Sequence, residues 1–241
     1  MSPRNQKLSA TICLTPLLLA APGATFADMV VNPNPESADT VYVGPGVAIP
    51  DNNPAGVTSV INVADSYSIA SLTITINMGP PTHTWIGDLV LTLTHGATSI
   101  DLMRKVGSGT ATGLGDSSDF GGSYVFTDAA STRLVDVANV AGAAVVVAPG
   151  NYRATNNIFN GNGSPTFTGE QIVNINAAFA GANVNGAWTL TLADTASGDT
   201  ASLGSWSIDV TAVPEPSAFA LLGVMAAGAL GVRAWRKRKV A

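Results

Sequence analysis

The sequence predicts an all-β protein with the architecture of an antiparallel jelly-roll β-sandwich. Several segments of the 241-residue chain alternate apolar and polar residues with a period of two, as half-buried strands do. Stretches rich in Gly, Asn, Asp and Ser separate these segments. The middle of the chain has no long apolar stripe of helical period, which argues against a helical domain. About nine short strands over roughly 155 residues favour one sandwich or jelly roll.

The first element, residues 1–27, is predicted to be a signal peptide. Arg4 and Lys7 give it a basic start, and an apolar stretch runs over residues 8–21. Residues 25–27, Thr-Phe-Ala, place small residues at the third and first positions before the expected cleavage point. We therefore expect the mature chain to be exported.

The body is expected to begin after an irregular lead-in, because residues 28–54 contain five prolines. Trp188 and Trp206 fall on the inward faces of alternating segments, so we expect both in the core. Trp85 and Tyr124 lie near loops and are the better candidates for an exposed contact. The predicted strands span residues 57–63, 71–77, 89–93, 99–103, 124–127, 143–147, 171–177, 188–192 and 206–210.

The last element, residues 213–241, is predicted to reach a membrane. Residues 213–217 read Val-Pro-Glu-Pro-Ser, and an apolar run over residues 218–232 follows. A helix over residues 217–232 would span about 24 Å, slightly less than a bilayer core of about 30 Å, and snorkelling side chains can bridge the difference. The positive-inside rule keeps the basic end cytoplasmic and leaves the body outside. The basic residues are Arg233, Arg236, Lys237, Arg238 and Lys239.

The order of these features resembles the PEP-CTERM sorting signal of Gram-negative bacteria. Val213, Pro214, Glu215 and Pro216 supply the motif, followed by the apolar helix and the Arg-rich end. The resemblance implies processing by a membrane exosortase near the motif, followed by release to the cell surface or extracellular matrix. It also implies an association with exopolysaccharide and biofilm. A plain single-span membrane anchor is the alternative.

The charge of the body excludes one class of partner. Residues 28–212 carry 15 acidic and four basic residues, a net charge of −11. Because nucleic-acid binding needs a basic face, we expect no nucleic-acid partner. The only cysteine, Cys13, lies in the predicted signal peptide, and its removal leaves no disulfide and no Cys-ligated metal site.

Three motifs in the body follow one another in order. Residues 83–89 read His-Thr-Trp-Ile-Gly-Asp-Leu, and residues 186–194 read Gly-Ala-Trp-Thr-Leu-Thr-Leu-Ala-Asp. Residues 198–208 begin with Gly-Asp and end with Leu-Gly-Ser-Trp-Ser-Ile. Together they resemble the P domain (P/Homo B domain) that follows the catalytic unit in kexin- and furin-like proteases. The resemblance covers roughly residues 55–212 and implies an eight- or nine-stranded jelly roll with an accessory, non-catalytic role.

The sequence contains no recognisable catalytic unit. His83 and His95 are the only histidines, and neither a Gly-x-Ser-x-Gly elbow nor a His-Glu-x-x-His site is present. We expect His83 to be structural and His95 to end a strand in solvent. The sequence therefore predicts a non-enzymatic surface or matrix protein whose jelly roll binds polysaccharide or a surface protein. The alternative is an accessory P domain that acts in trans with a subtilisin/kexin-like serine endopeptidase.

Loop aspartates are candidate calcium ligands, because calcium prefers oxygen ligands. The P-domain resemblance supports this hypothesis, since members of that family sometimes bind calcium. The alternative is that the same carboxylates cap turns by accepting backbone N–H bonds. No other cofactor is expected. The candidates are Asp116, Asp119, Asp128, Asp194 and Asp199.

Overall fold

A computed structural model describes residues 39–158 and 169–213, and this part of the chain is dominated by β-strands. The elements are β1 (Asp39–Ile49), β2 (Asn53–Val63), β3 (Ile69–His83), the 3₁₀ helix η1 (Ile86–Asp88), β4 (Leu89–His95), β5 (Thr98–Arg104), β6 (Phe120–Phe126), α1 (Leu134–Ala141), β7 (Gly150–Tyr152), β8 (Ala154–Asn157), β9 (Glu170–Val173), α2 (Ile175–Phe179), β10 (Gly186–Asp194) and β11 (Ala201–Ala212). The prediction of an all-β protein is confirmed.

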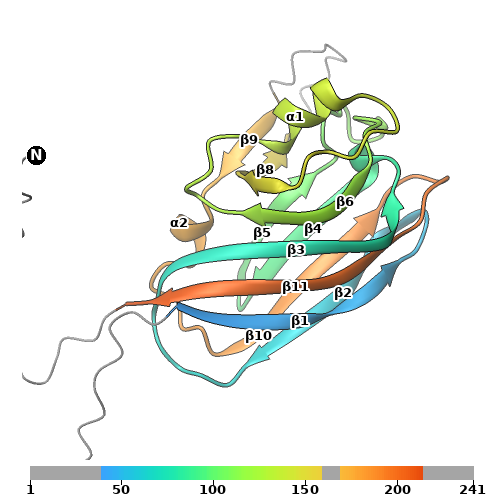
Figure 1. Cartoon of the computed structure of the whole chain (residues 1–241). Coiled ribbons are helices and arrows are strands. Elements are labelled where there is room, and N and C mark those ends of the chain that lie inside the picture. The colour runs from blue at the N-terminus through green and yellow to red at the C-terminus, as the bar shows by residue number, and fades with distance from the viewer. Residues whose placement is uncertain (1–38, 159–168, 214–241) are drawn as a thin grey trace, which may run out of the picture. The chain divides into compact units, whose positions relative to one another are not determined.

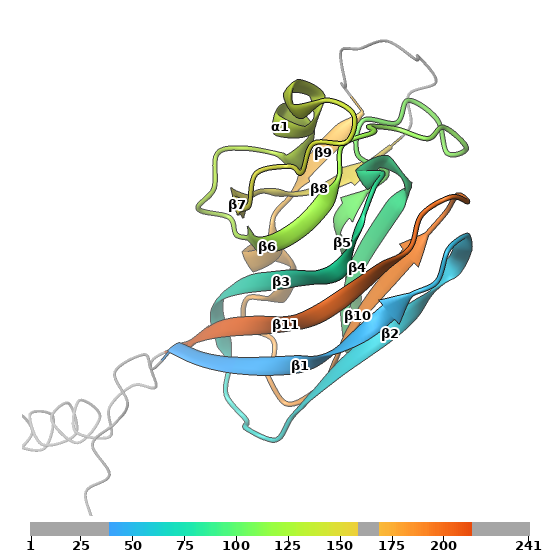
Figure 2. The ribbon, with the colours of Figure 1, turned by 45° about the vertical axis from the view of Figure 1, so that its right-hand side comes forward.

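Two sheets form a sandwich. One has the strand order β1-β11-β3-β6-β7, and the other has the order β2-β10-β4-β5. Figures 1 and 2 show them stacked in two layers, with α1 and the β8–β9 hairpin beyond β6 at one end. All strand pairs are antiparallel except β6 and β7, which pair in parallel.

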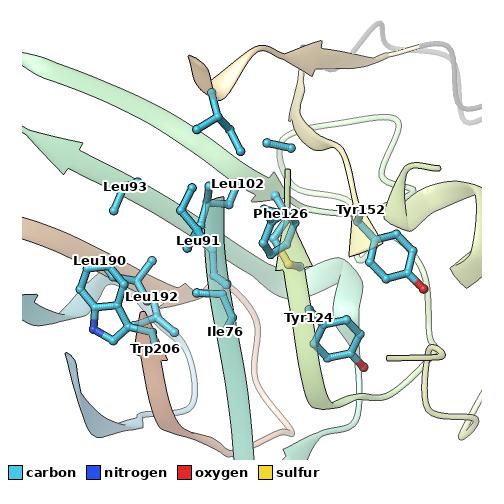
Figure 3. Close-up of a cluster of buried hydrophobic side chains, with 14 of the residues drawn as sticks. Ile76, Leu91, Leu93, Leu102, Tyr124, Phe126, Tyr152, Leu190, Leu192 and Trp206 are labelled. Carbon is cyan, nitrogen blue, oxygen red and sulfur yellow. The ribbon is translucent and has the colours of Figure 1, made fainter. Parts of the chain in front are cut away.

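The period-two pattern of the sequence produces the core between these layers. Along β3, β4, β10 and β11 every second residue is apolar and buried, so each strand presents one face to the opposite sheet. Figure 3 shows Ile76 and Trp206 of one sheet beside Leu91, Leu190 and Leu192 of the other. Both predicted core tryptophans are fully buried, but Tyr124 is buried as well, so its expected exposure is wrong.

The position of the Trp206 ring explains why residue 44, on the neighbouring strand β1, is a glycine. Its indole N–H donates to Ser59 Oγ at 2.8 Å, which satisfies the buried donor. The ring lies against Gly44, where an added Cβ would come within 2.1 Å of Trp206 Nε1. Any side chain at residue 44 would therefore displace the indole.

The expected irregular lead-in over residues 28–54 is wrong from Asp39 onward. β1 pairs with β11 from Asp39 opposite Thr211 to Ile49 opposite Ala201, and β2 begins at Asn53. The prolines are compatible with these strands because β1 and β2 are sheet edges. An edge strand has one side without ladder hydrogen bonds, where a missing N–H has no cost.

Two weakly predicted strands also differ from the structure. Residues 143–147 form a loop that pairs with Asp119 through an isolated bridge at Val146, and Tyr124 of β6 donates to Val147 O at 2.8 Å. Residues 171–177 divide into the end of β9 and the start of α2, because Asp128 accepts the backbone N–H groups of Ile175 and Asn176. A tertiary contact therefore sets the start of this helix. The other predicted strands coincide with β2, β3, β4, β5, β6, β10 and β11.

No helix in the described part of the chain is both long and apolar enough to cross a membrane. The predicted signal peptide (1–27) and the predicted transmembrane helix of the tail lie outside the described residues.

Candidate functional site

A group of buried ionisable side chains lies at one end of the sandwich. His83, Asp88, Lys105 and Asp194 are each at most 4% exposed, and we name them the buried charged cluster. His83 ends β3, Asp88 ends η1, Lys105 follows β5 and Asp194 ends β10. Four chain segments therefore bring charge to one point, although charged side chains are rarely fully buried without partners.

Hydrogen bonds fix the state of His83. The backbone N–H of Trp85 donates to His83 Nδ1 at 3.2 Å, so that nitrogen carries no proton. His83 Nε2 lies 3.2 Å from Asp194 Oδ2 and donates to it. The second oxygen of Asp194 accepts the N–H of Ala196 at 3.2 Å. Both ring nitrogens of His83 are therefore engaged within the protein.

Lys105 and Asp88 are joined through a hydroxyl group. Lys105 Nζ donates to Thr195 Oγ1 at 2.7 Å, and that hydroxyl donates to the backbone oxygen of Asp88 at 2.8 Å. The Asp88 Oδ1 atom is buried and has no hydrogen-bond partner among the described residues. The Asp88 carboxyl is consequently desolvated with little compensation.

Burial shifts the pKa values of this pair in opposite directions. It raises the pKa of Asp88 from 3.8 to about 6, although the charge of Lys105 opposes the shift. It lowers the pKa of Lys105, against the attraction of Asp88 and Asp194. In each case the charged form loses hydration, so the neutral form is favoured.

The three motifs of the body meet at this cluster. His83 of the first motif contacts Asp194 of the second, and Thr84 of the first donates to Asp199 of the third. Burial also raises the pKa of Asp199. These contacts join the ends of β3 and β10 to the loop before β11. The residues of all three motifs therefore have a structural role.

The predicted calcium ligands are not brought together. Among the described residues, no group of three or more His, Cys, Asp or Glu side chains is arranged to hold a metal ion. Asp116 accepts the N–H of Ser118, Asp128 accepts two N–H groups of α2, and Asp194 and Asp199 accept the bonds described above. Asp119 Oδ1 is buried without a hydrogen-bond partner. Three of the five carboxylates, those of Asp116, Asp128 and Asp194, thus accept backbone N–H bonds as the capping alternative expects, and the five candidates do not gather into one site among the described residues.

His95 lies in the wall of a surface depression at the other end of β10. Its expected place in solvent is wrong, since it is 9% exposed. Its ring stacks on Trp188 with centroids 3.9 Å apart and planes inclined by 2°. Nδ1 contacts Ala187 O at 3.0 Å and Nε2 contacts Asn183 O at 2.8 Å, so neither nitrogen is free. The depression has a volume of about 390 Å³.

Trp85, the other candidate for an exposed contact, is only partly exposed, and its indole N–H donates to Leu114 O at 2.7 Å. Of the predicted sorting residues, Val213 is described, and its N–H donates to Ser68 O at 2.8 Å. Pro214, Glu215, Pro216 and the basic cluster lie outside the described residues.

Sequence reasoning missed Lys105 and the interior place of His95. One signal was available for Lys105, because it is one of only four basic residues in the body and lies two residues after the predicted strand 99–103. No pattern in the sequence distinguishes a stacked strand-end histidine from a solvated one.

Comparisons with known proteins identify one segment. Residues 212–239 match the model of the PEP-CTERM protein-sorting motif. No curated protein sequence matches the chain. Two crystal structures of an Aeromonas sobria serine protease, one of them in complex with its chaperone, are similar at 15% identity, with TM-scores of 0.33 and 0.34. The similarity covers 72% of this chain and 27% of the protease chain, so this chain spans about a quarter of that length.

The sorting motif implies a protein that passes the membrane and is targeted to an exosortase. The chain is thus an exported all-β protein that carries a PEP-CTERM sorting motif at residues 212–239.

Proposed function

We propose that this protein is a surface or extracellular-matrix component whose β-sandwich binds a partner and catalyses no reaction. The observation that carries the proposal is the sorting motif, which directs the body to the outside of the cell. The exosortase would cleave near Pro214–Pro216 and release the sandwich from its membrane helix. An association with exopolysaccharide in the biofilm matrix follows from that destination.

The two histidines support a non-catalytic role. A general base needs a ring nitrogen that can reach the substrate. In His83 both nitrogens are hydrogen-bonded and the side chain is fully buried, and in His95 both nitrogens face backbone oxygens. A serine nucleophile would find no free imidazole in the described sandwich, since these are the only histidines of the chain.

The finer identity of the body is also a proposal. The contacts of His83 with Asp194 and of Thr84 with Asp199 join the motifs that resemble the P domain, and they support a jelly roll of that kind. The same contacts favour a second candidate function, an accessory P domain that acts in trans with a subtilisin/kexin-like serine endopeptidase. Co-purification of such a protease with this protein would favour the second candidate.

Fractionation of the producing cells tests the first candidate. The protein and a variant with Pro214, Glu215 and Pro216 all replaced by alanine would be followed in membrane, matrix and medium. We expect the wild type in the matrix and the variant in the membrane fraction. The double variant Thr73→Val, Thr75→Val changes two partly exposed threonines of the sandwich, outside the sorting motif, and serves as the control that is expected to follow the wild type. Equal distribution of the wild type and the triple variant would contradict the proposal.

A further inference from the structure

The depression beside His95 is lined by hydrogen-bonding groups, and its described lining includes no Lys, Arg, Asp or Glu. Its polar side chains include the hydroxyls of Thr94 and Thr189 and the amide of Asn185, together with His95. Each His95 nitrogen lies within hydrogen-bond distance of a backbone oxygen, so the ring offers little to a ligand. A volume of about 390 Å³ falls within the range of small-ligand pockets, about 300 to 1,000 Å³.

The depression is held open and has a rigid wall. Gly186 has φ +117°, a conformation that favours glycine, and an added Cβ would contact His95 Cε1 at 3.7 Å. The stack on the fully buried Trp188, together with the close contacts of the ring nitrogens with backbone oxygens, fixes the orientation of His95. A ligand would therefore meet a preformed surface, which lowers the entropic cost of binding.

Two rows of hydroxyl groups extend from the depression across the outer face of the sheet. In the first row Thr189 lies between Val60 and Thr94, and Thr94 is opposite Ser99. The second row is parallel to the first and runs over Thr58, Thr191 and Thr92. Neighbouring members are about 4.8 Å apart, the spacing of strands in a sheet.

The hydroxyl groups retain hydrogen-bonding capacity. Thr94 Oγ1 and Ser99 Oγ share one bond of 3.0 Å, but each hydroxyl has one donor and two acceptor positions. Thr94, Thr189, Thr92 and Thr191 are all partly exposed, while alternate residues of the same strands, Leu93 and Leu190 among them, face the core. The sheet thus presents an ordered polar surface to solvent.

The net charge of the body indicates which class of polymer could bind to the depression and the threonine rows. A net charge of −11 over residues 28–212 repels polyanions, and the described lining of the depression has no basic side chain to offset this repulsion. An uncharged polymer with many hydroxyl groups meets no such repulsion. Its hydroxyl groups can donate to the threonines of both rows and accept from them, except from Thr92, whose hydroxyl already donates to Asp101 Oδ1 at 2.8 Å.

We propose that the depression at Thr94, His95, Gly186 and Thr189, with the two threonine rows beside it, binds an uncharged polysaccharide. This inference rests on the proposed function and names the ligand class and the site. Binding by many weak hydrogen bonds along a strand face gives modest affinity per sugar unit and higher avidity along a polymer.

The test measures retention of the mature protein in native gels that contain a soluble polysaccharide. Dextran, mannan and galactomannan serve as uncharged probes, and alginate serves as the anionic probe.

The double variant Thr94→Val, Thr189→Val removes two hydroxyls and keeps β-branched shapes that suit a strand. Ala187→Glu places a charge at an exposed residue of the same depression. The matched control is Thr73→Val, Thr75→Val, two partly exposed threonines on the outer face of the other sheet.

We expect at least one uncharged polysaccharide to retard the wild type and the control, and alginate to retard neither. The double variant should bind about thirtyfold more weakly, since two hydrogen bonds of about 1 kcal/mol are lost, and Ala187→Glu should also weaken binding. Unchanged melting temperatures would show that the variants are folded. Equal retardation of wild type and double variant, retention by alginate alone, or no retardation by any uncharged polysaccharide would each overturn the inference. Export and matrix location, measured in the same strains, report on the proposed function separately.

Discussion

At the scale of single residues, the buried polar groups differ in whether their hydrogen bonds are satisfied. His83 and Asp194 satisfy each other where solvent cannot, and Asp88 is buried with one oxygen unpaired. An unpaired buried polar atom typically costs about 1 to 3 kcal/mol, so Asp88 is a weak point that depends on its protonation state.

Asp88 should make stability depend on pH. Its pKa rises from 3.8 to about 6 on folding, so the folded state binds the proton more tightly than the unfolded state between these values. The free energy of unfolding should therefore fall as the pH rises from about 4 to 6, by about 2 to 3 kcal/mol, and then level off. The variant Asp88→Asn lacks this titrating carboxyl, so its free energy of unfolding should lack this pH-dependent component.

Urea unfolding of both proteins at several pH values between 4 and 7 measures the effect. We expect the stability difference between Asp88→Asn and wild type to shift in favour of the variant as the pH rises. A difference that is constant from pH 4 to pH 7 would show that the Asp88 pKa is the same in the folded and unfolded states.

Gly44 should be intolerant of any side chain. Gly44→Ala places a Cβ within 2.1 Å of Trp206 Nε1, so the indole must move and its bond to Ser59 must break. We expect a loss of about 2 to 4 kcal/mol, the sum of overpacking and one unpaired buried donor. Gly150→Ala is the matched control, because its Cβ would meet nothing closer than 3.7 Å. Similar urea midpoints for the two variants would refute this account of Gly44.

At the scale of elements, hydrophobic period and edge position explain most strands, and tertiary contacts explain the exceptions. β3, β4, β10 and β11 follow directly from alternation, because each has one buried face. β1 was not predictable from its prolines, because edge position is a property of the assembled sheet. α2 was not predictable either, since its start depends on Asp128, which is distant in sequence.

The capping of α2 gives a prediction at this scale. Asp128→Ala removes the acceptor of two N–H groups at the start of the helix, so we expect a loss of about 1 to 2 kcal/mol. Asp128→Asn keeps one acceptor oxygen and should lose less. If thermal melts rank the asparagine variant below the alanine variant, the carboxylate does not act as a cap.

The same strand joins the two sites considered above. β10 carries the depression at its start, near Gly186, and the buried charged cluster at its end, at Asp194. These ends are about 27 Å apart at about 3.3 Å per residue, so substitutions at one site should leave the other unaffected. The sequence motifs contain His83, Asp88 and Asp194 of the cluster, but the sequence did not predict that they meet or that Lys105 joins them. It did not indicate the depression, which depends on strand register and on the stacking of His95.

At the scale of the whole molecule, the acidic body should fold without calcium. The candidate carboxylates mostly accept N–H and O–H bonds, and the described residues hold no ligand cluster. We expect the same melting temperature in millimolar calcium and in EDTA, apart from the small rise that screening of a net charge of −11 produces. Magnesium at equal ionic strength is the control. A rise of several degrees with calcium alone would restore the calcium hypothesis.

The sorting motif and the β-sandwich together indicate what this protein does. The tail directs the chain to an exosortase, and the sandwich offers a rigid polar face with no free histidine. These features support the proposal that the sandwich binds a partner outside the cell.

Mass spectrometry of the protein from membrane, matrix and medium tests whether the chain is cleaved near the sorting motif and released from the membrane. We predict that the matrix and medium forms start after residue 27 and end near Pro214–Pro216, without the basic residues 233–239. Molecules that end at Ala241 in every fraction would contradict it and leave a permanently anchored membrane protein.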